Sequence, residues 1–200
     1  MSDGADGEAI DRAVRAIRDG GAVVYPTETV YGLGADATDP AAIERVFAIK
    51  GRDRSKPLSL GVDSIDAARA FADLSERAEA FAREFLPGPV TVLASRTDRV
   101  PDALTGGEPR VGIRVPDHET ARDLARRAGP ITATSANLSG AGSATRIDEI
   151  DPAVREAAGA VIDGGGLDGV ASTVVDPERG EIVRRGAAAD AIEAWLQERS

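Results

Sequence analysis

The chain has 200 residues, 42% of them hydrophobic, and 34 acidic against 24 basic residues give it a formal net charge of -10. It has no cysteine and one histidine, His118, which excludes disulfides and thiolate chemistry and disfavours a histidine-based zinc centre or a Ser-His-Asp triad. No apolar run is long enough to span a bilayer, and the acidic start of the sequence lacks the apolar stretch of a secretion signal. We therefore expect a cytoplasmic protein with one domain over residues 1–200, without a membrane partner.

The first elements are a helix, a strand and a second helix. Apolar residues recur at helical spacing over residues 9–17, and a short buried strand is expected at residues 22–25. Residues 26–34 then leave that strand as a loop rich in hydroxyl groups. Asp39 followed by Pro40 is typical of a helix N-terminus, and Gly51 is placed to end that helix after Lys50.

Strands and helices alternate irregularly through the rest of the chain. Further strands are expected at residues 57–62, 90–94, 111–115, 131–133, 160–162, 172–175 and 182–184. Helices are expected at residues 65–72, 76–85, 147–158 and 187–196, and another is expected to be capped by Asp117 and to continue through Leu124. Residues 95–109 are expected to be a polar connection. This order predicts a mixed sheet with helices in one α/β domain.

Both lysines of the chain lie in one short segment, residues 50–57. Lys50 and Lys56 enclose Arg52 and Arg54, so the segment is strongly cationic within an acidic protein. Such a segment is suited to an anionic ligand. The alternative is that Lys50 ends a helix, where a cation interacts favourably with the helix dipole, and that the rest is a solvated loop.

Three hydroxyl-rich segments follow or begin expected strands. They are residues 27–29, 134–137 and 172–173. Ligands of open α/β sheets bind at strand ends, so these segments can converge with the cationic segment on one site. Each segment alone is equally typical of an ordinary turn. His118, beside Asp117, is interpreted as a surface or capping residue, with acid/base chemistry as the alternative, and Trp195 as a core residue.

Eight motifs occur in series: YPTETVYGLGADA (25–37), IKGR (49–52), PGPVTVL (87–93), VGIRVP (111–116), TSANLSG (134–140), DGG (163–165), STVVD (172–176) and VRRG (183–186). In this order they resemble the YrdC/TsaC family of threonylcarbamoyl-AMP synthases, over about residues 8–187. The resemblance implies a single YrdC-like α/β domain. Its twisted, mixed and largely open sheet would be flanked by helices and form a concave substrate cleft.

The resemblance also implies a reaction. L-Threonine, bicarbonate or CO₂, and ATP would be condensed to threonylcarbamoyl-AMP and pyrophosphate, with Mg²⁺ bridging the phosphates of ATP. The product would pass to the machinery that transfers the threonylcarbamoyl group to tRNA. No covalent enzyme nucleophile is needed, which agrees with a chain that lacks cysteine.

Individual residues match the family motifs. Lys50 and Arg52 form the basic pair that the resemblance implies for phosphate binding and catalysis, with Arg54 a solvated neighbour. The implied nucleotide side also includes Lys56, Arg110, Ser135, Asn137, Ser143 and Arg184. The implied threonine side is Thr29, Arg114, Ala133 and Ser172. Arg114 would bind the amino-acid carboxylate, Thr91 would line the cavity, and no protein metal site is implied.

The chain departs from the family pattern at Gly61, where many relatives have histidine, and at Ala171, where glutamate is common. The sequence ends at Ser200, without the further domain of longer relatives, so we expect a more open site.

Two alternative functions remain. One is double-stranded RNA binding, for which a basic concavity is suited and which Arg122, Arg126 and Arg127 would extend if they form a basic face; a solvated helix face is the favoured interpretation of these three arginines. The other is a regulator that binds nucleotide or threonine without turnover.

Overall fold

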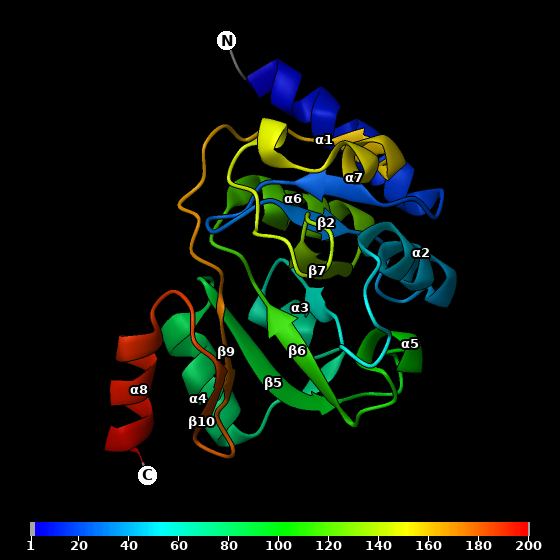
Figure 1. Ribbon diagram of the computed structural model, residues 1–200. Coiled ribbons are helices and arrows are strands. Elements are labelled where there is room, and N and C mark those ends of the chain that lie inside the picture. The colour runs from blue at the N-terminus through cyan, green and yellow to red at the C-terminus, as the bar shows by residue number, and fades with distance from the viewer. Residues whose placement is uncertain (1–2, 200) are drawn as a thin grey trace.

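The computed structural model describes residues 3–199, which form one mixed sheet of ten strands with helices around it (Figure 1). The strands are β1 Val23–Tyr25, β2 Gly32–Gly34, β3 Ser59–Gly61, β4 Ala72–Asp73, β5 Val90–Arg96, β6 Arg110–Arg114, β7 Ile131–Ser135, β8 Ala160–Val161, β9 Thr173–Asp176 and β10 Glu181–Arg184. Their order across the sheet is β10-β9-β5-β6-β3-β7-β2-β1-β8, and β4 also pairs with β5. Three of the pairings, β1–β8, β3–β6 and β5–β9, are parallel and the others are antiparallel. The predicted mixed sheet is confirmed.

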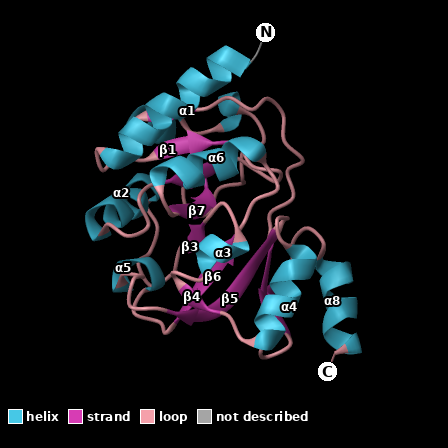
Figure 2. Ribbon diagram, turned by 180° about the vertical axis from the view of Figure 1, so that it is seen from behind, coloured by secondary structure: helices cyan, strands magenta, loops and turns pink. Residues whose placement is uncertain are grey.

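The helices are α1 Asp3–Arg18, α2 Pro40–Lys50, α3 Ile65–Ala68, α4 Glu76–Phe85, α5 Asp102–Thr105, α6 Glu119–Ala128, the 3₁₀ turn η1 Ile147–Glu149, α7 Pro152–Ala157 and α8 Ala189–Glu198. Figure 2 shows α3, α4 and α6 in front of the strands, so these helices cover one face of the sheet. None of the helices within residues 3–199 combines the length and the apolar character needed to cross a membrane.

The two central strands β5 and β6 have one apolar and one polar face, because side chains alternate across a strand. Val90, Val92 and Ile113 belong to the main hydrophobic core, together with Phe81 of α4. The residues between them face the other way and line a cavity; they are Thr91, Leu93, Arg110, Gly112 and Arg114. The alternation of these two strands therefore separates the core from the site.

Helix α2 begins and ends at the predicted residues. Asp39 accepts a hydrogen bond from the Ala41 amide (2.9 Å), and Pro40 occupies the first turn, where its missing N–H costs nothing. Gly51 ends the helix in the left-handed region at φ 56°, which favours glycine. The helix therefore holds Lys50 in its last turn and releases the cationic segment directly afterwards.

We expect Asp39→Ala to lower the free energy of unfolding by about 1 kcal/mol, because the helix loses its side-chain cap. Asp39→Asn keeps an acceptor oxygen at this position and should leave stability nearly unchanged. Urea titration of both variants measures the difference. Equal losses in the two variants would show that the carboxylate charge, and not the cap, is responsible.

One predicted loop contains a strand. Gly32–Gly34, within the expected loop of residues 26–34, forms β2 and pairs with β1, so that Gly32 lies opposite Tyr25. A Cβ on Gly32 would lie 2.7 Å from Cζ of Tyr25, because the tyrosine ring occupies the space that a side chain at position 32 would need. Glycine is depleted in strands, and for this reason the sequence pattern did not indicate one.

Other boundaries differ for local reasons. The helix expected over residues 65–72 ends at Ala68 and is followed by β4, and the connection over residues 95–109 contains α5. The helix expected over residues 147–158 is divided into η1 and α7, because Asp151 and Pro152 begin a new helix. His118, not Asp117, is the N-cap of α6, and it makes no side-chain capping bond. Trp195 is confirmed as a core residue, in edge contact with Phe81.

Candidate active site

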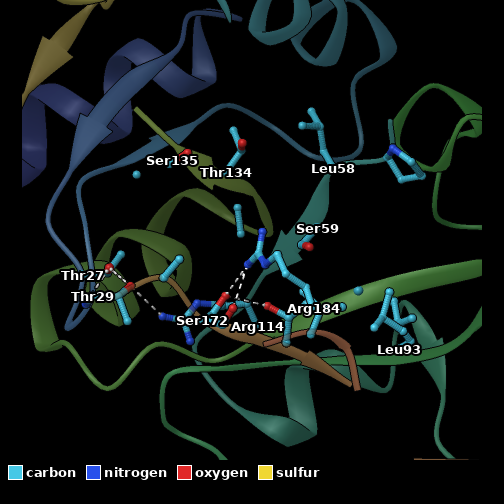
Figure 3. A pocket seen from close by; sticks show the side chains of 18 of the residues that line it. Thr27, Thr29, Leu58, Ser59, Leu93, Arg114, Thr134, Ser135, Ser172 and Arg184 are labelled. Atoms are coloured by element: carbon cyan, nitrogen blue, oxygen red, sulfur yellow. Dashed lines mark hydrogen bonds between the residues drawn. The ribbon is translucent and has the colours of Figure 1, made fainter. Parts of the chain in front are cut away.

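A cavity of about 590 Å³ lies on the polar face of the sheet, lined by residues of β3, β5, β6, β7, β9, β10 and neighbouring loops (Figure 3). This volume is typical of sites for small molecules and cofactors. The lining brings together segments that lie far apart in the sequence, including all three hydroxyl-rich segments and Arg52 of the cationic segment. The predicted convergence is therefore confirmed for the three hydroxyl-rich segments, whereas of the four basic residues of the cationic segment only Arg52 takes part.

Five arginines line the cavity: Arg52, Arg110, Arg114, Arg179 and Arg184. Among residues 3–199, neither Arg52 nor Arg184 forms an ion pair; both donate to backbone carbonyls, and Arg184 also donates to the Ser172 hydroxyl (3.1 Å). Burial lowers the pKa of each of these two guanidinium groups, and a neighbouring arginine lowers it further. Two uncompensated cations in a cavity provide strong attraction for a polyanion.

Hydroxyl groups gather around Arg114, close to Arg184 (Figure 3). Nη2 of Arg114 lies 3.3 Å from Oγ1 of Thr29, which lies 2.9 Å from Oγ1 of Thr27. Figure 3 shows these three side chains on one side and Ser172, bonded to Arg184, beside them. A buried guanidinium among hydroxyls is suited to a small carboxylate with further polar groups.

The cationic segment does not act as one unit. Lys50 is only 2% exposed, does not belong to the cavity lining, and donates from Nζ to the carbonyls of Ser135 and Asn137 (2.6 Å for the latter). Burial, with a smaller contribution from Arg52, lowers the pKa of Lys50 to about 8. Arg54 is ion-paired with Glu44 (2.6 Å) and its side chain is 66% exposed, as expected of a solvated neighbour.

The other sequence-predicted residues fall into two groups. The cavity is lined by Thr29, Arg52, Thr91, Arg110, Arg114, Ala133, Ser135, Ser143, Ser172 and Arg184. Lys50, Lys56 and Asn137 are not in the lining, and Lys56 is exposed. The Asn137 amide instead donates to the carbonyls of Leu138 (2.7 Å) and Ala141 (2.9 Å), which shapes the loop after β7. Ala171 lines the cavity, and Gly61 lines a smaller adjoining pocket.

Sequence reasoning missed two groups of residues. Ser59, Glu108 and Arg179 line the cavity without belonging to any of the recognised motifs. Glu28 and Asp176 do lie within motifs, YPTETVYGLG and STVVD, but their ion pairs with cavity arginines became visible only in the structure.

Within residues 3–199 there is no group of three histidine, aspartate or glutamate side chains arranged to hold a metal ion. All three arginines of α6 are ion-paired with acidic residues, which agrees with a solvated helix face and not with an uncompensated basic face; the pairs are Arg122–Asp117, Arg126–Asp63, Arg126–Asp123, Arg127–Asp11 and Arg127–Asp123.

A model of the Sua5/YciO/YrdC family, described as "Telomere recombination", matches residues 15–186. The chain is 41% identical over 163 residues to a threonylcarbamoyl-AMP synthase of Pyrococcus abyssi, covering 80% of this chain and 48% of the relative. It is 35% identical over 180 residues to a threonylcarbamoyl-AMP synthase of Xanthomonas axonopodis pv. citri, covering 88% of this chain and 96% of the relative. The chain therefore spans about half the length of the first relative and nearly all of the second.

The fold is similar to that of the P. abyssi protein Sua5, whose crystal structure was solved in complex with L-threonine. The two share 39% identity at a TM-score of 0.84, over 88% of this chain and 54% of that one. The similarity confirms the predicted α/β fold with a twisted mixed sheet flanked by helices.

Proposed function

The chain belongs to the Sua5/YciO/YrdC family, and we propose that it is a threonylcarbamoyl-AMP synthase. It would condense L-threonine, bicarbonate or CO₂, and ATP to threonylcarbamoyl-AMP and pyrophosphate. One observation carries the proposal: a single cavity holds two arginines without a carboxylate partner among residues 3–199, Arg52 and Arg184, and also the buried Arg114 with the Thr29 hydroxyl beside it. Such a cavity can take a triphosphate and an amino acid together.

The chemistry needs positioning and charge neutralisation more than a reactive side chain. The threonine amine, once deprotonated, adds to CO₂ and forms a carbamate. A carbamate oxygen then attacks the α-phosphorus of ATP as the bond to the β-phosphate oxygen breaks, and pyrophosphate leaves. Arg52 and Arg184 would neutralise charge on the phosphates, and Thr29, Arg114 and Ser172 would hold threonine in line for the attack.

Mg²⁺ would enter as part of the substrate, MgATP. Phosphate oxygens and water would supply its ligands, since no acidic cluster is found among residues 3–199. We further propose that the reaction takes place in the cytoplasm and that the product is used by enzymes that modify tRNA. The RNA-binding alternative has less support, because the arginines of α6 are ion-paired.

Pyrophosphate release from purified protein tests the proposal. Release should require threonine, bicarbonate and MgATP together, and should fall to background when valine replaces threonine. High potassium chloride belongs among the conditions, because a chain of net charge -10 with few lysines is typical of salt-adapted proteins. Release that is independent of threonine, or tight and salt-sensitive RNA binding without release, would overturn the proposal.

A further inference from the structure

We propose that Glu28 and Asp176 are positioning residues, two carboxylates that stand outside the cavity lining and each orient an arginine at one end of it. Glu28 would orient Arg114 for the threonine, and Asp176 would orient Arg110 for the nucleotide. The inference rests on the proposed function, and it predicts that the two carboxylates affect different substrates.

Glu28 forms an ion pair with Arg114 from outside the cavity lining. Its neighbours Thr27 and Thr29 line the cavity, whereas Glu28 does not. Oε2 of Glu28 lies 2.9 Å from Nη2 of Arg114, and Oε1 accepts a hydrogen bond from the Asp117 amide at 3.0 Å. The carboxylate thus connects the loop after β1 with the segment after β6, and one of its two oxygens contacts Arg114.

Arg114 is 7% exposed, so the direction of its guanidinium group depends on the groups that enclose it. Its Nη1 donates to the carbonyls of Gly88 and Val90, and its Nη2 donates to Oγ1 of Thr29 and forms an ion pair with Glu28. A glutamine at position 28 would remove the negative charge beside Nη2 of Arg114 and would place its NH₂ group against a donor, either Arg114 or the Asp117 amide. Arg114 would keep the Nη1 contacts with Gly88 and Val90 but would lose the carboxylate that orients Nη2.

Asp176 forms the corresponding ion pair with Arg110, on the proposed nucleotide side of the cavity. It is 2% exposed and forms a two-pronged ion pair with Arg110, with Oδ2 at 2.9 Å from Nη1 and Oδ1 at 3.0 Å from Nη2. Such bidentate pairs fix the plane of a guanidinium group. Oδ1 also accepts hydrogen bonds from the amides of Glu178 (3.1 Å) and Arg179 (3.2 Å), so the same carboxylate shapes the turn that brings Arg179 to the cavity.

The cavity arginines thus serve two purposes. The carboxylates of Asp176 and Glu28 compensate the charges of Arg110 and Arg114. These two arginines therefore contribute oriented hydrogen-bond donors more than net positive charge. Within residues 3–199, Arg52 and Arg184 have no such carboxylate, so they contribute the charge that attracts phosphate.

The test compares Glu28→Gln with Asp176→Asn, each serving as the control for the other. We expect Glu28→Gln to raise KM for threonine about 10-fold and to leave KM for ATP within about twofold. Asp176→Asn should give the reverse. Calorimetric titration of each variant with threonine alone and with MgATP alone provides a readout that does not depend on turnover.

A purely structural role would lower the melting temperature and the active fraction of the protein without separating the two substrates. Equal effects on both KM values, or a fall in KM for threonine in Glu28→Gln, would overturn the proposal. If Asp176→Asn does not fold, Arg110→Gln and Asp176→Glu test the same contact, and both should raise KM for ATP. A wild-type protein without threonine-dependent turnover would refute the proposed function, while calorimetry would still decide whether the carboxylates control binding.

Discussion

Replacing Arg52 by alanine is expected to lower kcat/KM for ATP by about 100-fold, because one preorganised cation is removed from the charge that develops on the phosphates. Arg52 lines the cavity, and its side chain is held by the carbonyls of Lys56 (3.0 Å) and Pro57 (3.0 Å). These neutral acceptors orient the guanidinium group without cancelling its charge. The charge is therefore available to the substrate and is removed in the alanine variant.

Arg54→Ala is the matched control for this prediction. Arg54 belongs to the same segment but is ion-paired with Glu44 outside the cavity, and exposed ion pairs contribute little. Its removal should change kcat/KM for ATP by no more than about twofold. The measurement is steady-state pyrophosphate release with ATP varied at saturating threonine. A loss in Arg54→Ala as large as that in Arg52→Ala would show that the segment acts by its total charge.

The sequence predicted local structure best where a residue type is suited to a single structural role. Asp39, Pro40 and Gly51 predicted both ends of α2, because a cap, a first-turn proline and a left-handed glycine have no equally good alternative there. The strands expected at residues 90–94 and 111–115 were likewise found, as β5 and β6. Strand β2 was missed, because its glycines are compensated by the Tyr25 ring, a contact between two strands that no local pattern contains.

The same distinction applies to the site. The hydroxyl-rich segments at strand ends and the family resemblance were sufficient to predict that Arg184, Arg114 and Thr29 would line one cavity. They were not sufficient for Lys50, whose side chain direction depends on how the loop after β7 packs against the end of α2. Nor could they identify Glu28 and Asp176, because an ion pair between residues that are 86 or 66 positions apart exists only in the folded chain.

Replacing Lys50 by methionine is expected to lower kcat/KM for ATP by about 100-fold. Two roles of Lys50 would each produce this loss, and only one of them requires the positive charge of its side chain. Lys50 holds the loop that carries Ser135 into the cavity, by donating to the carbonyls of Ser135 and Asn137. It was also predicted from the sequence to bind phosphate as a cation. Lys56→Met is the comparison: the resemblance places Lys56 on the nucleotide side, but its side chain is exposed and outside the cavity lining, so the variant should lose much less activity than Lys50→Met.

The pH dependence separates the two roles, because burial lowers the pKa of Lys50 to about 8. A neutral amine still has two N–H groups and can keep both carbonyl contacts, but it no longer attracts phosphate. If the charge matters, kcat/KM for ATP should fall in the wild type as pH rises through 8, and Lys50→Met should lack this step. A flat wild-type profile from pH 7 to 9.5 would assign Lys50 to loop positioning alone.

The stability of the protein should change in the opposite direction over the same range. The pKa of Lys50 is lower in the folded state than its ordinary value of 10.5, so between these values the unfolded chain binds more protons. The free energy of unfolding contributed by Lys50 therefore rises from pH 8 towards pH 10.5. Urea titrations at pH 7.5 and 9.5 should show this gain in the wild type relative to Lys50→Met. An enzyme that becomes more stable while it loses activity would identify Lys50 as a residue whose buried charge is retained for the substrate at a cost to the fold.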